Sequence, residues 1–151
     1  MTTSDRDAPL PVMARQGAQD WAQHMTEYMA QTAGIALTPG SAEPFFNDCV
    51  GKHDEVAKDG RYTMSYAVYS SVPLETHPEA VRKIRTMLEE QGFKIEGYRE
   101  TANGKISPLL DASQPSGNYL ISVETTTGGL LLLRVNTTCL MPPASPSQSA
   151  G

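Results

Sequence analysis

Apolar residues recur at helical spacing along the segment 14–34. The larger ones fall at positions i, i+4, i+7 and i+8, and they are Trp21, Met25, Tyr28 and Met29. This spacing places them on one face of a helix and predicts that this face packs on a core. Gly34 follows the stripe and is the residue type that most often ends a helix in the left-handed conformation.

A second helix is predicted over residues 76–92. Thr76 and Glu79 have the spacing of a capping box, with Pro78 in the first turn, and both features are typical of helix starts. Gly92 is expected to end this helix. The predicted buried stripe consists of Ala80, Val81, Ile84, Met87 and Leu88.

Four segments have the composition and the alternation of strands, and they are 61–72, 93–100, 118–126 and 130–138. In the first of these, one face is the more apolar and is expected to meet the helices; it consists of Tyr62, Met64, Tyr66, Val68 and Ser70. Gly128 and Gly129 predict a tight hairpin between the last two strands. The order α-β-α-β-β-β predicts an α+β two-layer sandwich, with a mainly antiparallel four-stranded sheet and two helices on one face.

The two ends of the chain differ in composition from the middle. Residues 1–12 are polar and contain two prolines, and we interpret them as a flexible lead or linker. Residues 142–151, PPASPSQSAG, predict a disordered tail rich in proline and serine. The segment 13–141 between them is expected to form one domain, because 151 residues suit a single hydrophobic core.

Charge and hydropathy limit the classes of partner. The formal net charge is −5, and no basic stripe is present that would neutralise phosphates, so we expect no nucleic-acid binding. No stretch approaches the roughly 20 apolar residues of a membrane span. The first residues lack the charged and apolar regions of a signal peptide. We therefore expect either a cytosolic protein or an exported one whose signal segment is not part of this sequence.

Cys49 and Cys139 are the two cysteines of the chain. Cys49 precedes the first long strand, Cys139 ends the last one, and neither belongs to a CxxC motif, so the pattern predicts a structural disulfide. Such a bond would close a loop of about 90 residues and would persist only in an oxidising compartment. Two thiols are half a zinc site and no histidine completes it, so we expect no metal and no cofactor. Two free thiols in a cytosolic protein remain the alternative.

Several blocks of the chain resemble secreted or lipoprotein ectodomains of actinobacteria to which no activity is assigned. The blocks are TAGIALTPG, CVGKHDE, DGRYTMSYAV, HPEAVRKIRTMLEEQGFKIEGYRE, GNYLISVET and LLLLRVNTTCLMPP, and together they span most of residues 30–143. The resemblance implies an exported, disulfide-bonded, membrane-associated protein. It transfers no functional residues. No lipobox is present, so a membrane tether would lie outside this sequence.

Two sets of residues are candidates for function. His53, Asp54 and Glu55 form the best polar cluster, and a histidine beside carboxylates could act as a general base; the alternative is a hydrated loop. Motifs such as G-x-S-x-G, Walker A and HExxH are absent, which favours a role without catalysis. The second set lies in strands: exposed Tyr69, Thr63 and Thr125 on an uncovered sheet face would form a binding surface; the alternative is ordinary β-propensity.

These observations lead to one first hypothesis and two alternatives. The first is an extracytoplasmic binding or accessory module, associated with the cell envelope and held by one disulfide, whose partner is an unidentified protein or envelope component. The second is a small hydrolase-like enzyme that uses the loop of His53, Asp54 and Glu55. The third is a cytosolic adaptor with free thiols.

Overall fold

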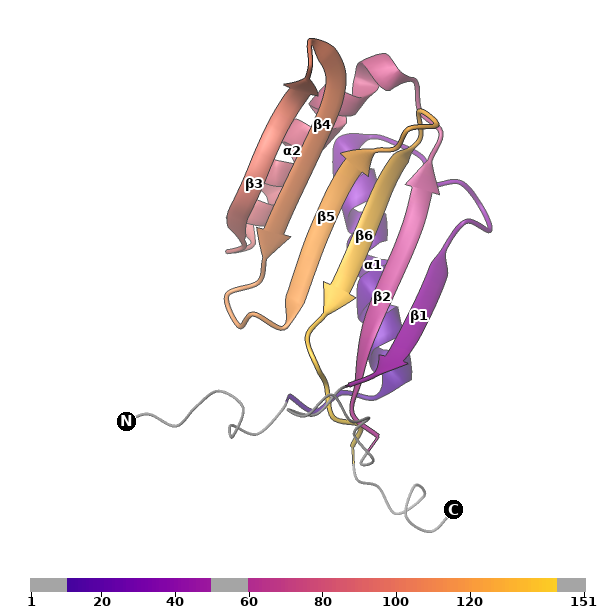
Figure 1. Ribbon diagram of the computed structural model, residues 1–151, viewed down its shortest axis with the longest axis vertical. Helices are drawn as coiled ribbons and strands as arrows, with labels where there is room; N and C mark the ends of the chain where they lie inside the picture. Colours follow the sequence, from indigo (N-terminus) through magenta and orange to yellow (C-terminus); the bar gives the residue numbers. More distant parts are fainter. Residues whose placement is uncertain (1–10, 50–59, 144–151) are drawn as a thin grey trace.

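The computed structural model describes residues 11–49 and 60–143 (Figure 1). Its elements, in chain order, are α1 (Arg15–Ala33), β1 (Glu43–Asp48), β2 (Tyr62–Ser70), the 3-10 turn η2 (Leu74–Thr76), α2 (His77–Glu90), β3 (Lys94–Ala102), β4 (Lys105–Ser113), β5 (Tyr119–Thr125) and β6 (Leu131–Thr137). The strands form one sheet in the order β1-β2-β6-β5-β4-β3. Every neighbouring pair is antiparallel. The predicted α+β class is confirmed.

The prediction of a four-stranded sheet is wrong, because the sheet has six strands. The two strands that were missed are β1 and β4, and each contains a proline, Pro44 and Pro108. Proline is tolerated at sheet edges and bulges, where its missing N–H leaves no ladder bond unmade. β1 is an edge strand. Pro108 lies beside the irregularity in the β3–β4 register. It directly precedes Leu109, the first residue of β4 that pairs with β5.

Both helices lie against the same face of the sheet, α1 behind the β1–β2–β6 half and α2 behind the β3–β4–β5 half (Figure 1). Burial alternates along β2, and the face predicted to meet the helices is the buried one. In the neighbouring strands, the residues that continue this face in register are buried too. Its central members, all 3 % exposed or less, are Met64, Val68, Leu110, Ala112, Ile121, Val123, Leu131, Leu133 and Val135.

The helix ends were predicted in part. Gly34 and Gly92 adopt the left-handed conformation after their helices, with φ of 73° and 89°. The predicted capping box at Thr76 is wrong, because the Thr76 side chain makes no cap bond and its hydroxyl donates to the carbonyl oxygen of Pro73 instead, at 2.7 Å. The turn η2, in which Thr76 is the last residue, leads directly into α2.

The first and last described residues lie side by side at one end of the sheet. The Met13 N–H donates to the carbonyl oxygen of Met141, and the Met141 N–H donates to that of Pro11, both at 2.9 Å. Leu140 exchanges two backbone hydrogen bonds with Tyr62 at the start of β2. The lead, the start of β2 and the segment after β6 are therefore joined at this end. Residues 1–10 and 144–151 lie outside the described residues.

Candidate functional site

The predicted disulfide between Cys49 and Cys139 is confirmed, with the two Cα atoms 6.1 Å apart across 90 positions of sequence. Cys49 follows β1, is 6 % exposed, and donates its backbone N–H to the carbonyl oxygen of Arg61. Cys139 follows β6 and precedes the Leu140 pairing with Tyr62. The bond therefore ties the end of an edge strand to the end of a central strand, at the same end of the sheet as the two described chain termini.

The polar cluster His53, Asp54 and Glu55 lies outside the described residues. Its candidate role as a general base stays a prediction. Among the residues that the structure does describe, no group of three or more His, Cys, Asp or Glu side chains is arranged to hold a metal ion. No helix in that part of the chain is long and apolar enough to cross a membrane.

The three residues predicted to share an uncovered sheet face do not lie together. Thr63 and Tyr69 are on the face of β2 turned away from the helices, and both are half-buried. Thr125 lies on the opposite face, because it is paired in register with fully buried Leu131. Thr63 and Tyr69 are six residues apart in one strand, a distance of about 20 Å at the rise of a β-strand. They therefore do not form one small site.

Thr125 belongs to a buried polar contact that the sequence did not reveal. His77 at the start of α2 is 0 % exposed. Its Nε2 lies 2.9 Å from the carbonyl oxygen of Val72, and its Nδ1 lies 2.8 Å from the Thr125 hydroxyl. A carbonyl oxygen only accepts, so Nε2 donates to Val72, and in the neutral ring Nδ1 then accepts from the Thr125 hydroxyl. Both ring nitrogens are satisfied, and the contact fixes the start of α2 against β5.

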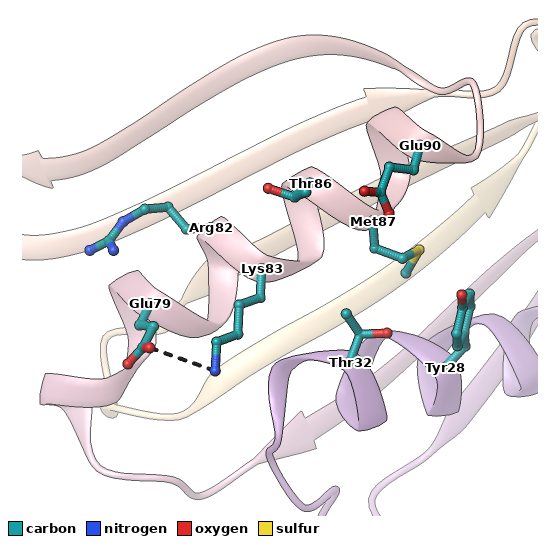
Figure 2. Close-up of a pocket in the computed structure, with 8 residues that line it drawn as sticks. All are labelled: Tyr28, Thr32, Glu79, Arg82, Lys83, Thr86, Met87 and Glu90. Carbon is teal, nitrogen blue, oxygen red and sulfur yellow. Dashed lines mark ion pairs between the residues drawn. The ribbon is translucent and has the colours of Figure 1, made fainter.

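A groove lies between the C-terminal half of α1 and the outer side of α2 (Figure 2). Its volume is about 420 Å³. Met87, which is 4 % exposed, lies between the two helices in this groove, and Tyr28 faces it from α1 with 44 % of its surface exposed. The other lining residues are Thr32, Glu79, Arg82, Lys83, Thr86 and Glu90. Sequence periodicity assigned Tyr28 to the buried stripe, whereas it lies at the border of that stripe.

Charge is distributed unevenly along this groove. Toward the N-terminal end of α2, Lys83 Nζ lies 3.6 Å from Glu79 Oε2, an exposed pair one helical turn apart. At the other end, Glu90 lines the groove with its carboxylate beside Met87, and Tyr28 faces Met87 from α1 (Figure 2). Within the described residues, Glu90 has neither an ion pair nor a side-chain hydrogen bond. Lys83 is therefore paired in this groove, whereas the carboxylate of Glu90 is not.

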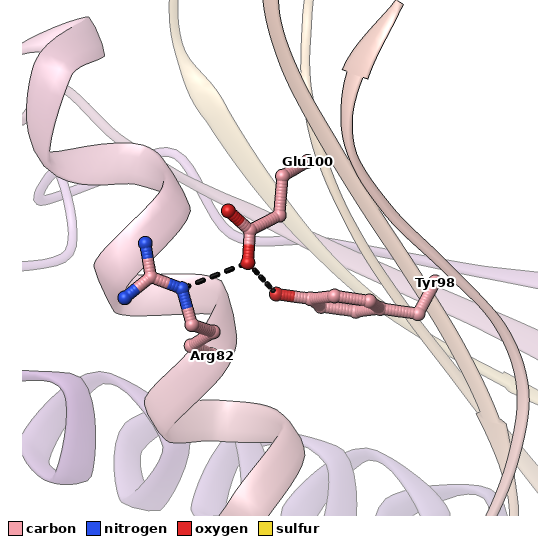
Figure 3. Close-up of polar contacts among 3 residues, drawn as sticks. All are labelled: Arg82, Tyr98 and Glu100. Carbon is pink, nitrogen blue, oxygen red and sulfur yellow. Dashed lines mark hydrogen bonds and ion pairs between the residues drawn. The ribbon is translucent and has the colours of Figure 1, made fainter.

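Arg82 points out of the groove toward the β3 edge (Figure 3). Its Nε donates to Glu100 Oε2 at 2.8 Å, and the Tyr98 hydroxyl donates to the same oxygen at 2.6 Å. The hydrogen bond from Tyr98 and then that from Arg82 lower the pKa of Glu100 below its ordinary value. Burial, and then the hydrogen bond to Glu100, raises the pKa of Tyr98.

The basic cluster of α2 is neutralised by its neighbours. Arg82 is paired with Glu100. Arg85 lies 3.8 Å from Glu89 and stands over the Tyr98 ring, with its guanidinium carbon 4.6 Å from the ring centroid. Together with the pair of Lys83 and Glu79, these contacts give Arg82, Lys83 and Arg85 an acidic neighbour each.

Comparison with protein-family models, with curated proteins and with solved structures gives no significant match.

Proposed function

We propose that the protein acts outside the cytoplasm, as a binding or accessory domain of the cell envelope whose fold is held by one disulfide. The observation that carries the proposal is the bond between Cys49 and Cys139. Disulfides that close long loops persist in oxidising compartments and are rare where thiols are kept reduced. The resemblance to secreted and lipoprotein ectodomains of actinobacteria supports the same compartment.

The position of the bond supports an attachment role for one end of the domain. The disulfide, the paired segments 11–13 and 140–141, and the start of β2 all lie at that end. A tether attached at either described terminus would therefore connect to the end of the domain that the disulfide crosslinks. The helix groove of Tyr28, Met87 and Glu90 lies on the outer side of the helix layer (Figure 2), where a tether at that end leaves it open to a partner.

The two alternatives are less well supported. A cytosolic adaptor predicts two free thiols, and Cys49 and Cys139 are joined. A hydrolase predicts a pocket that brings His53 together with a nucleophile or carboxylate, and His53 lies outside the described residues. No feature of the described residues favours either alternative over a binding domain.

Labelling of intact cells tests the compartment. The native host is treated with a membrane-impermeant, amine-reactive biotin reagent, and the protein is then purified and its labelled lysines are counted. We expect Lys83, Lys94 and Lys105, which are all exposed, to be labelled in intact cells to the same extent as in lysed cells. A known cytosolic protein from the same cells serves as the control. Labelling only after lysis would contradict the proposal.

A further inference from the structure

Glu90 occupies an electrostatically unfavourable position in α2. It is the last residue of the helix, and the last turn contains no basic residue. A helix C-terminus carries partial negative charge, so a carboxylate there is destabilising unless a cation compensates it. Glu89, its neighbour in the same turn, has Arg85 as a partner. Glu90 has none within the described residues, and its carboxylate extends into the groove instead (Figure 2).

Three sources of negative potential therefore line this end of the groove. They are the Glu90 carboxylate, the C-terminal end of α2, and the π-face of the Tyr28 ring, which attracts cations. The Tyr28 hydroxyl also has no hydrogen-bond partner among the described residues. The cations that line the groove, Lys83 and Arg82, are paired with Glu79 and Glu100. The groove lacks a cation at the point where its electrostatics favour one.

We propose that this groove binds the side chain of a lysine or arginine presented by a partner protein. The inference rests on the proposed binding function and names the chemistry of the partner. The charged end group lies between Glu90 and the Tyr28 ring, the methylenes of the side chain lie on Met87, and the Thr32 hydroxyl accepts a further N–H bond. Long basic side chains bury their stems on apolar surface in this way and keep the charge at a polar edge. A net charge of −5 attracts such a partner over longer range.

The unfavourable position of the Glu90 carboxylate in the helix also means that the site can be tested without loss of the fold. Glu90→Gln removes a charge that opposes the helix dipole, so the variant is expected to have a urea midpoint equal to or higher than that of the natural protein. Glu89→Gln is the matched control, since it removes a carboxylate from the same turn that already has a partner. A pair of changes at Tyr28 separates the ring from the hydroxyl, because Tyr28→Phe keeps the π-face and Tyr28→Leu does not.

Titration by NMR measures the interaction directly. The full chain, labelled at methionine methyl groups and tyrosine rings, is titrated with an end-blocked Gly-Gly-Lys-Gly-Gly peptide and with its norleucine analogue, which has the same apolar stem without the charge. We expect the Met87 and Tyr28 signals to shift, with Kd for the lysine peptide lower than for the norleucine peptide by roughly fivefold. The preference should fall below twofold in Glu90→Gln and in Tyr28→Leu, and should persist in Glu89→Gln and Tyr28→Phe.

Three results would overturn the proposal. The first is equal binding of the lysine and norleucine peptides, and the second is an equal loss of preference in Glu90→Gln and Glu89→Gln. The third is tighter binding of free putrescine than of the lysine peptide, which would assign the site to a small amine and not to a partner protein. These results are independent of the labelling of intact cells, so failure of this inference and failure of the proposed compartment are distinguishable.

Discussion

Arg82 and Tyr98 donate to the same atom, Oε2 of Glu100, at 2.8 and 2.6 Å (Figure 3). Arg82 comes from α2, whereas Tyr98 and Glu100 are two residues apart in β3. The shared carboxylate oxygen therefore connects the helix layer to the edge of the sheet. Charge-assisted bonds of this kind are stronger than neutral ones, but all three groups lie near solvent, which limits what they add to stability.

The lowered pKa of Glu100 predicts a dependence of stability on acid. A carboxyl whose folded pKa lies below its unfolded value stabilises the fold above the unfolded value, and that contribution is lost as pH falls through the folded pKa. We expect the urea midpoint of the natural protein to exceed that of Glu100→Gln at pH 7, and the difference to vanish as pH falls below the ordinary value of 4.5. Urea unfolding of both proteins between pH 7 and 3 measures this. A difference that stays constant over this range would contradict the prediction.

Four tyrosines predict the opposite dependence at high pH. Burial, as the largest cause, raises the pKa of each above the ordinary value of 10.0, and they are Tyr62, Tyr66, Tyr98 and Tyr119. A group with a raised folded pKa contributes stability that is complete below the unfolded value and is lost as pH rises through the folded value. We expect ultraviolet titration of the six tyrosines to show a late phase that coincides with loss of the far-ultraviolet circular dichroism. Complete ionisation near pH 10 with the fold intact would be the contrary result.

Thr125 is expected to contribute to stability and not to a surface. Thr125→Val removes the donor to His77 Nδ1 and leaves that buried nitrogen unpaired, which costs about 1–3 kcal/mol of the free energy of unfolding. The control is Thr63→Val, on the uncovered face of the sheet, where the expected change is within about 0.5 kcal/mol. Urea unfolding measures both. Equal effects of the two substitutions would show that the contact of His77 with Thr125 adds nothing to stability.

Removal of the disulfide is expected to have the largest effect. In the chain-entropy model, a bond that closes a loop of 90 residues stabilises the fold by roughly 4–5 kcal/mol. The double variant Cys49→Ala, Cys139→Ala should lose this amount in urea unfolding at pH 7. Reductant should destabilise the natural protein to a similar extent and leave the double variant unchanged. A loss below about 1 kcal/mol in the variant would contradict the structural role of the bond.

The helices and the long strands were predictable because their patterns are local. The 3.6-residue stripe of α2 and the alternation of β2 can each be recognised within the segment itself. The apolar face of each element is buried as expected. β1 and β4 escaped prediction because Pro44 and Pro108 mark turns in most contexts. Only the position of each strand in the sheet, at an edge or beside a bulge, makes the proline acceptable there.

The disulfide is the part of the candidate site that could be predicted from the sequence. Two cysteines at strand ends indicated a disulfide, because pairing needs no knowledge of register. Thr125 was assigned to the wrong face, since a residue at the end of a strand changes face with a shift of one position. The groove of Tyr28 and Glu90 forms between two helices, and their relative placement is set by the sheet. A signal was present in Glu89 and Glu90, two acidic residues at the end of a helix where basic ones are favoured.

The most direct test of the account is the redox state of the two cysteines in the cells that produce the protein. Native cells are lysed into denaturant that contains a thiol-blocking reagent, and the mass of the purified protein then gives the number of blocked thiols. A bond between Cys49 and Cys139 that persists in its compartment predicts no blocked thiol in the folded population, and two after prior reduction. Two blocked thiols without reduction would contradict the disulfide and, with it, the proposed location of the protein outside the cytoplasm.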